Sequence, residues 1–117
     1  MTSAHSGLEG HWEVSALEVG GELVPPIEAS RLTLNVDEER VSGSSGVNRF
    51  TGQLGHDGLF GALATTRMAG PHELTAQEDI FLRHLNEAEA WEHYGEGISL
   101  TSLGLITVTL TPSPPSI

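Results

Sequence analysis

The residues whose chemistry stands out first are a few arginines in an acidic chain. All five cationic side chains are arginines, against sixteen acidic residues. Three of the five fall between positions 40 and 70, a stretch that also holds seven glycines. Because cationic side chains are so scarce here, those in this stretch and their neighbours could line a ligand or partner surface. These candidate binding residues are Asn48, Arg49, Thr66, Arg67 and Met68.

A structural role explains the same residues without a ligand. Asparagine caps backbone groups in turns, and a partly buried arginine usually pairs with a carboxylate. In that case Asn48, Arg49 and Thr66 would hold two glycine-flanked segments together. Both interpretations remain open at the level of the sequence.

The six histidines, at positions 5, 11, 56, 72, 84 and 93, do not predict a metal site. No two of them have the His-x-x-x-His spacing that places both rings on one helix face. His11-Trp12-Glu13 has the His-x-Glu pattern of zinc deaminases, but that site also needs two cysteines, and the chain has none. Only a meeting in space, such as that of His84 with His93, would create a site. We therefore predict no metal and no cofactor.

Catalytic motifs are also missing. The chain has no cysteine nucleophile, no Gly-x-Ser-x-Gly turn and no phosphate-binding loop before a helix. Gly43-Ser44-Ser45-Gly46 lacks the lysine and the strand-to-helix context of such a loop, so it predicts a bend or bulge. The sequence predicts no catalytic residues and a protein that is not an enzyme.

Length and charge narrow the class of protein. A chain of 117 residues is expected to form one domain. Its net charge of −11 opposes binding to nucleic acid and to anionic lipid headgroups. We expect a monomer. The chain shows no signal peptide and no membrane-spanning run, which favours the cytoplasm, or an exported mature form.

Hydrophobic periodicity predicts short strands. Trp12, Val14 and Ala16 alternate with polar neighbours, the period-two pattern of a half-buried strand. Leu32, Leu34 and Val36 repeat this pattern. Turns are predicted at Gly20-Gly21, Asp37-Glu38-Glu39 and Gly95-Glu96-Gly97, and Asp57-Gly58 is a strong hairpin signal. Further strands are predicted at Arg40–Ser42, Asn48–Leu54, Leu59–Leu63, Ile98–Thr101 and Leu105–Leu110.

One helix is predicted, from about Ala76 to Ala90. Thr75 and Glu78 have the spacing of a capping box, in which the two side chains satisfy free N–H groups at the helix start. An apolar stripe would pack the helix on a sheet. The stripe consists of Phe81, Leu85 and Ala88.

Together these elements predict a mainly β fold. About eight short strands joined by hairpins favour an antiparallel sheet curled into a partly open β-barrel, with one α-helix packed against it. We expect a disordered lead-in at residues 1–7, a single domain at 8–111 and a flexible proline-rich tail at 112–117.

Two motifs in this chain resemble those of the META domain family, which includes the heat-shock protein HslJ. The first is Gly46-Val47-Asn48-Arg49-Phe50-Thr51-Gly52, and the second is Thr66-Arg67-Met68-Ala69-Gly70-Pro71. The opening, with Leu8, Gly10 and Trp12, is also similar. The resemblance covers nearly the whole of residues 8–111. It implies a partly open antiparallel barrel with one helix, and a link to stress response.

Both departures from the family motifs fall on cysteine positions, where this chain has Val47 and Gly70. The resemblance implies that the two family cysteines lie close together and can pair. Val47 would then pack over Gly70, with their Cα atoms within about 4.4–6.8 Å.

For function, we predict a non-enzymatic binding or accessory module. One alternative is a half-barrel that binds a small apolar ligand or lipid, which needs an apolar cavity of about 300 Å³ or more. Another is a protease inhibitor-like module, with Val24–Ala29 or Gly55–Gly58 as the exposed loop. The partner is an unknown protein or a small apolar ligand.

Overall fold

The computed structural model describes residues 8–28, 30–55 and 59–113. The predicted lead-in, the Asp57-Gly58 turn and residues 114–117 lie outside this part of the chain. The elements, in chain order, are β1 (Gly10–Val19), β2 (Glu22–Val24), β3 (Thr33–Asp37), β4 (Arg40–Ser44), β5 (Arg49–Gln53), β6 (Ala64–Thr65), α1 (His72–Glu87), β7 (Ala90–Tyr94), β8 (Gly97–Ser102) and β9 (Leu105–Pro112).

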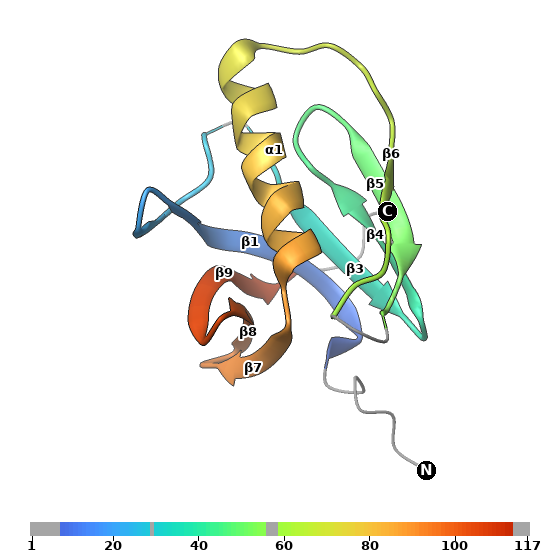
Figure 1. Cartoon of the computed structure of the whole chain (residues 1–117), viewed down its shortest axis with the longest axis vertical. Coiled ribbons are helices and arrows are strands. Elements are labelled where there is room, and N and C mark those ends of the chain that lie inside the picture. The colour runs from blue at the N-terminus through green and yellow to red at the C-terminus, as the bar shows by residue number, and fades with distance from the viewer. Residues whose placement is uncertain (1–7, 29, 56–58, 114–117) are drawn as a thin grey trace.

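The nine strands form one antiparallel sheet in the order β6-β5-β4-β3-β1-β9-β8-β7, and β2 pairs with β1. The sheet is not closed into a barrel, since β6 and β7 end the path of paired strands. In the view of Figure 1, α1 lies in front of β1, with β3 to β6 on one side and β7 to β9 on the other. The predicted mainly β fold with one helix is confirmed.

The central strand β1 carries a bulge that changes which side chains reach the core. Trp12 and Val14 are buried as the alternation predicts, but the next buried side chain is Leu17, while Ala16 is only half-buried. The pairing of β1 with β9 shifts between Val14 and Ala16. An extra residue at this point reverses the alternation, so the bulge directs the larger leucine inward.

The core lies between the sheet and α1. The predicted stripe Phe81, Leu85 and Ala88 is fully buried, and so are Leu32, Leu34 and Val36 of the sheet. The rings of Phe50 and Phe81 meet edge to face, with centroids 5.9 Å apart. Such aromatic pairs contribute about 0.5–1.5 kcal/mol beyond their buried area.

The predicted helix start was wrong. The helix begins at His72 after the N-cap residue Pro71, and no side-chain hydrogen bond caps it. The N–H of Thr75 donates to Pro71 O, so Thr75 lies inside the first turn. Glu78 does not form a capping box, because its carboxylate binds a different part of the chain. The helix also ends earlier than predicted, at Glu87.

Leu59–Leu63 was predicted as a strand and does not form one. A single bridge joins Leu54 to Phe60, and regular pairing returns only at β6. The N–H of Leu59 donates to Ala88 O at 3.0 Å, and the N–H of Gly61 donates to Gln53 O of β5 at 2.8 Å. The segment is therefore bonded both to the end of α1 and, at isolated points, to β5. Gly52 allows the chain to pass closely, because a Cβ there would lie 2.7 Å from Leu63 Cδ2.

The last strand runs one residue into the predicted tail. Strand β9 continues to Pro112, and the N–H of Ser113 donates to His11 O at 2.8 Å. The beginning of the proline-rich segment is therefore bonded to β1.

Candidate functional site

Asn48 is the centre of the contacts that join the two family motifs. Its Oδ1 accepts hydrogen bonds from Thr66 Oγ1 at 2.9 Å and from Met68 N at 2.6 Å. Its Nδ2 donates to Met68 O at 3.2 Å and to Glu78 Oε1 at 2.8 Å. A carboxamide offers two donors and two acceptor positions. All four are used within the protein, which gives Asn48 a structural role.

Glu78 links this centre to α1 and was not singled out as a site residue by the sequence. Its side chain is 6% exposed. Oε2 accepts from Ser45 Oγ at 2.6 Å and from Asn48 N at 2.7 Å, and Oε1 accepts from Asn48 Nδ2. No arginine or histidine of the described residues forms an ion pair with this carboxylate. The helix is thus attached to the β4–β5 connection by one buried anion held by neutral donors.

The donors around Glu78 decide its protonation state. Desolvation by burial raises the pKa of the carboxyl, but hydrogen bonds from Ser45, from the Asn48 side chain and from the N–H groups of Asn48 and Val47 outweigh it, so the pKa lies below its ordinary value. Hydrogen bonds to the charged form favour ionisation. Glu78 is therefore an anion at neutral pH.

Val47 and Gly70 lie side by side. The Cβ of Val47 lies 3.3 Å from the position that a Cβ on Gly70 would occupy, and its two methyl carbons lie 2.6 and 2.8 Å from that position. The Cβ atoms of a disulfide are about 3.5–4.5 Å apart. The methyl groups of Val47 occupy the space that a second sulfur would need.

The other motif residues are placed differently from Asn48. Thr66 Oγ1 accepts from Arg49 N at 3.1 Å, so its hydroxyl is used inside the protein. The Met68 side chain is 62% exposed although its backbone binds Asn48. Arg49 and Arg67 are exposed, and neither forms an ion pair with a carboxylate of the described residues. The pairing suggested for a structural arginine is thus not observed.

A groove of about 720 Å³ opens between the β1–β2 turn, the C-terminal half of α1 and the β8–β9 turn. We call it the leucine groove, after Leu23, Leu103 and Leu105 in its wall. These side chains are 46%, 86% and 70% exposed. The residues that line this groove are not part of the hydrophobic core between α1 and the sheet.

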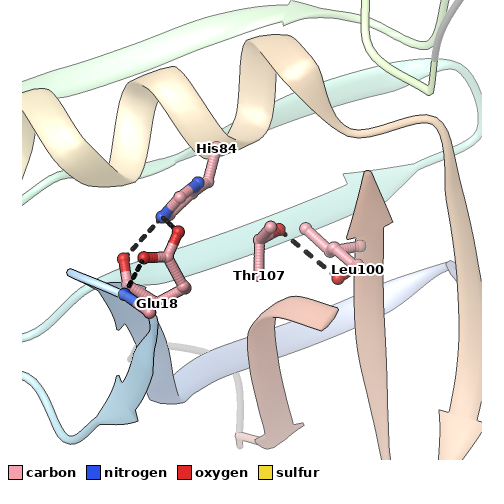
Figure 2. Close-up of polar contacts among 5 residues, drawn as sticks. Glu18, His84, Leu100 and Thr107 are labelled. Atoms are coloured by element: carbon pink, nitrogen blue, oxygen red, sulfur yellow. Dashed lines mark hydrogen bonds and ion pairs between the residues drawn. The ribbon is translucent and has the colours of Figure 1, made fainter. Parts of the chain in front are cut away.

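His84 closes the floor of the leucine groove. Figure 2 shows it pointing from α1 toward Glu18, with Nε2 2.7 Å from Glu18 O and 3.9 Å from Glu18 Oε1. Since a carbonyl oxygen only accepts, Nε2 is the donor. Nδ1 is buried and has no hydrogen-bond partner among the described residues. Glu18 Oε2 accepts from Gly21 N at 2.8 Å, which fixes the β1–β2 turn.

Leu103 forms the tip of the β8–β9 turn. Leu103 and Gly104 have φ values of 54° and 78°, the positive pair that a type I′ turn requires. Asparagine and glycine usually occupy these positions, and a leucine there is strained. Glu89 Oε1 accepts from Leu103 N at 2.6 Å and holds the turn in place. The signal was present in the sequence as Leu-Gly between two predicted strands, where Asn-Gly is expected.

The other predicted sites bring fewer residues together. Within residues 8–28, 30–55 and 59–113, no group of three or more histidines and carboxylates could hold a metal ion. His93 packs its ring against Trp91, with centroids 5.3 Å apart, while His84 binds Glu18. Val24–Ala29 was one of the two loops predicted as an exposed inhibitor-like loop. In this loop, Ile27 N donates to Gln77 Oε1 at 2.7 Å. The second such loop, Gly55–Gly58, lies mostly outside the described residues.

These features define a class: an open antiparallel sheet whose single helix is attached through a buried asparagine–glutamate contact. A META domain model matches residues 6–113, so the chain belongs to the META domain family. No curated protein matches it. It is similar to an NMR structure of a protein from Burkholderia xenovorans, with a TM-score of 0.74 and 24% identity over 96% of this chain and 88% of that one. The two share a fold.

The length and composition of the helix bear on whether it can cross a membrane. In the described part of the chain, no helix has the length and apolar character needed to cross a membrane.

Proposed function

We propose that this META domain is a non-enzymatic binding module whose leucine groove holds an apolar, positively charged segment of a protein partner. The observation that carries the proposal is Leu103, which is 86% exposed and held in a left-handed conformation. Asparagine would suit this turn better and leave no apolar side chain in water. A leucine at this position gains its stabilising contacts only when a partner covers it.

The apolar part of the interface would come from the three leucines of the groove. Burying one leucine side chain contributes about 1.5–3 kcal/mol. Leu103 lies at the tip of the β8–β9 turn, Leu105 is the first residue of β9, and Leu23 lines the groove from β2. Covering these side chains would supply the central anchors that small interfaces need.

The charge of the partner follows from the groove edges. Glu18 and Glu87 line the groove, Glu89 lies next to Leu103, and Arg83 is the single arginine in the wall. The chain as a whole carries −11. A positively charged segment would be attracted at long range and would bind in the correct orientation more often.

Binding is favoured over catalysis by the state of His84. This imidazole is the side chain in the groove best suited to proton transfer, but it is 3% exposed and its Nε2 is used by Glu18 O. A general acid or base must come within hydrogen-bond distance of its substrate.

An accessory role in stress response, which the resemblance to HslJ implies, belongs to the same proposal.

Replacing Leu103 with asparagine should separate binding from stability. We expect the free energy of unfolding to stay unchanged or rise by up to about 1 kcal/mol, because asparagine suits the turn. A helical leucine–lysine peptide should bind the wild type and lose about ten- to a hundredfold in affinity with the variant. Titration followed by amide chemical shifts measures both the affinity and the location.

The matched control is Met68→Asn, which removes another exposed apolar side chain away from the groove. We expect it to keep the wild-type affinity. The proposal is wrong if the peptide moves the same amides in wild type and in Leu103→Asn with equal affinity, or if the shifted amides lie outside the groove.

A small apolar ligand is a second candidate occupant, because the groove exceeds the roughly 300 Å³ that such sites need. Native mass spectrometry of protein purified from its own host, compared with a denatured sample, would reveal it as a mass that disappears on denaturation. A mass equal to the bare chain in both samples would leave the protein partner as the better explanation.

A further inference from the structure

A second hollow lies on the opposite face of the sheet from α1. It has a volume of about 610 Å³ and extends over β5, β4, β3 and β1. Its floor is a row of side chains in cross-strand register, in which Thr51 pairs with Ser42, Ser42 with Asn35, and Asn35 with His11. Their neighbours along the strands are buried in the core, and alternate side chains of a strand point to opposite faces. We call this hollow the polar groove.

The charge of the polar groove is opposite to that of the protein. The chain has sixteen acidic residues, yet none of the described ones lines this groove, whereas Arg31 and Arg49 do. Arg31 is partly neutralised by Glu13, whose Oε1 lies 3.1 Å from its Nη2. Arg49 is not. The groove is therefore a locally cationic hollow in a strongly anionic molecule.

Hydrogen bonds hold the backbone of Arg49 in place, whereas its side chain has no partner among the described residues. Its N–H donates to Thr66 Oγ1 at 3.1 Å, and its carbonyl accepts from Thr66 N at 3.0 Å. Its guanidinium has no hydrogen bond or ion pair with the residues the structure describes. A guanidinium presents its donors in a planar fork that matches the two oxygens of a carboxylate or phosphate.

The floor of the groove supplies further donors. His11 Nδ1 lies 2.8 Å from Asn35 Oδ1. Because that oxygen only accepts, Nδ1 donates, and the Asn35 amide group remains available as a donor. The hydroxyls of Ser42 and Thr51 lie in the same row. An anionic group bound by Arg49 would thus have neutral donors beside it.

We propose that the polar groove binds a small polar ligand through an oxyanion, a phosphate or a carboxylate, with Arg49 as its main contact. Its volume falls within the range of about 300–1,000 Å³ usual for small-molecule sites. A small ligand is favoured over a nucleic acid, because the net charge of −11 would repel a long polyanion. This site is distinct from the leucine groove and does not depend on its function.

Titrations with inorganic phosphate and with acetate, followed by amide chemical shifts and compared with sodium chloride at equal ionic strength, test the proposal. We expect saturable shifts at Arg49, Ser42 and Asn35. Saturation by phosphate alone identifies a phosphate ligand, by acetate alone a carboxylate, and by both a general oxyanion site. Shifts that are linear in both anions and equal to those in chloride would overturn the proposal.

Two charge-matched variants provide the control. Arg49→Gln and Arg67→Gln each remove one exposed arginine, so they change the overall charge equally, but only Arg49 lines the groove. We expect Arg49→Gln to weaken anion binding about tenfold or more, with an unchanged unfolding midpoint, and Arg67→Gln to bind like wild type. Equal losses in the two variants would show a general charge effect and overturn the assignment.

Discussion

Replacing Glu78 with alanine should lower the free energy of unfolding by about 3–5 kcal/mol, because it leaves buried donors without their acceptor. Ser45 Oγ, Asn48 N and Asn48 Nδ2 all donate to this carboxylate at 2.6–2.8 Å. None of them regains water easily, since Ser45 is fully buried and Asn48 is 6% exposed. Urea unfolding followed by circular dichroism measures the loss.

Two further variants test whether this loss of stability is specific to the Glu78 carboxylate. Asp79→Ala removes the next carboxylate along α1, which is exposed, and should change stability by no more than about 0.5 kcal/mol. Glu78→Gln keeps the size and one acceptor oxygen and should cost less than Glu78→Ala. If Glu78→Ala were as stable as Asp79→Ala, the contact between α1 and the β4–β5 connection would contribute nothing.

The same carboxylate predicts a pH dependence. Its pKa is lower in the folded state than in the unfolded chain, so the unfolded state binds the proton first as the pH falls. The contribution of Glu78 is fully present above the unfolded pKa and is lost as the pH falls through the folded pKa. Between neutral pH and about pH 3 the wild type should therefore lose more stability than Glu78→Gln. A steeper loss in the variant would reverse the sign and contradict this account.

The second large effect is an increase in the free energy of unfolding. The double variant Val47→Cys/Gly70→Cys should form a disulfide on oxidation, because the Cβ positions of these two residues lie 3.3 Å apart and a few tenths of an ångström of relaxation reaches the usual range. Closing a loop of about 24 residues should raise the free energy of unfolding by about 3 kcal/mol. Unfolding of the oxidised and reduced forms of the same variant measures the gain directly.

Single variants test whether the close approach of Val47 and Gly70 causes these changes in stability. Gly70→Ala should destabilise the protein by about 1–3 kcal/mol, because its new Cβ would meet the Val47 methyl carbons at 2.6 and 2.8 Å. Val47→Cys alone creates no such clash and should have a smaller effect. Two thiols that stay free under oxidising conditions would show that these positions do not approach each other in solution.

The sequence predicted the parts of the fold that depend on neighbouring residues. Alternation identified the buried face of Leu32, Leu34 and Val36, and helical spacing identified that of Phe81 and Leu85. These patterns are local, so the sequence alone carries them. The three-residue strand β2 is too short to show any period, and it was missed.

The errors arose where distant residues compete for the same group. Glu78 has the spacing of a capping residue, but its carboxylate accepts hydrogen bonds from Ser45 and Asn48, which lie 33 and 30 positions away in the sequence. Leu59 lies in an apolar run, but its N–H is used by Ala88. A local sequence pattern does not indicate which distant residue will form a hydrogen bond with these groups.

The candidate sites were predictable to different degrees. Asn48 and Arg49 were named from their types, and the structure separates their environments: one side chain is enclosed, while the other faces the polar groove. The leucine groove was not predicted, because it is assembled from β2, α1 and the β8–β9 turn. Its one local signal was the unusual leucine before Gly104.

An open sheet also has a consequence for self-association. Each of its two outer strands has unpaired backbone groups that another molecule can extend into a larger sheet. Here the outer strand β6 has only two residues, which leaves little backbone to copy, and the opposite strand β7 carries the exposed Glu92 and His93. Short length at one edge and charge at the other are features that keep open sheets from joining edge to edge. The two ends of the open sheet thus differ, because one has a strand of only two residues and the other carries a charged, exposed side chain.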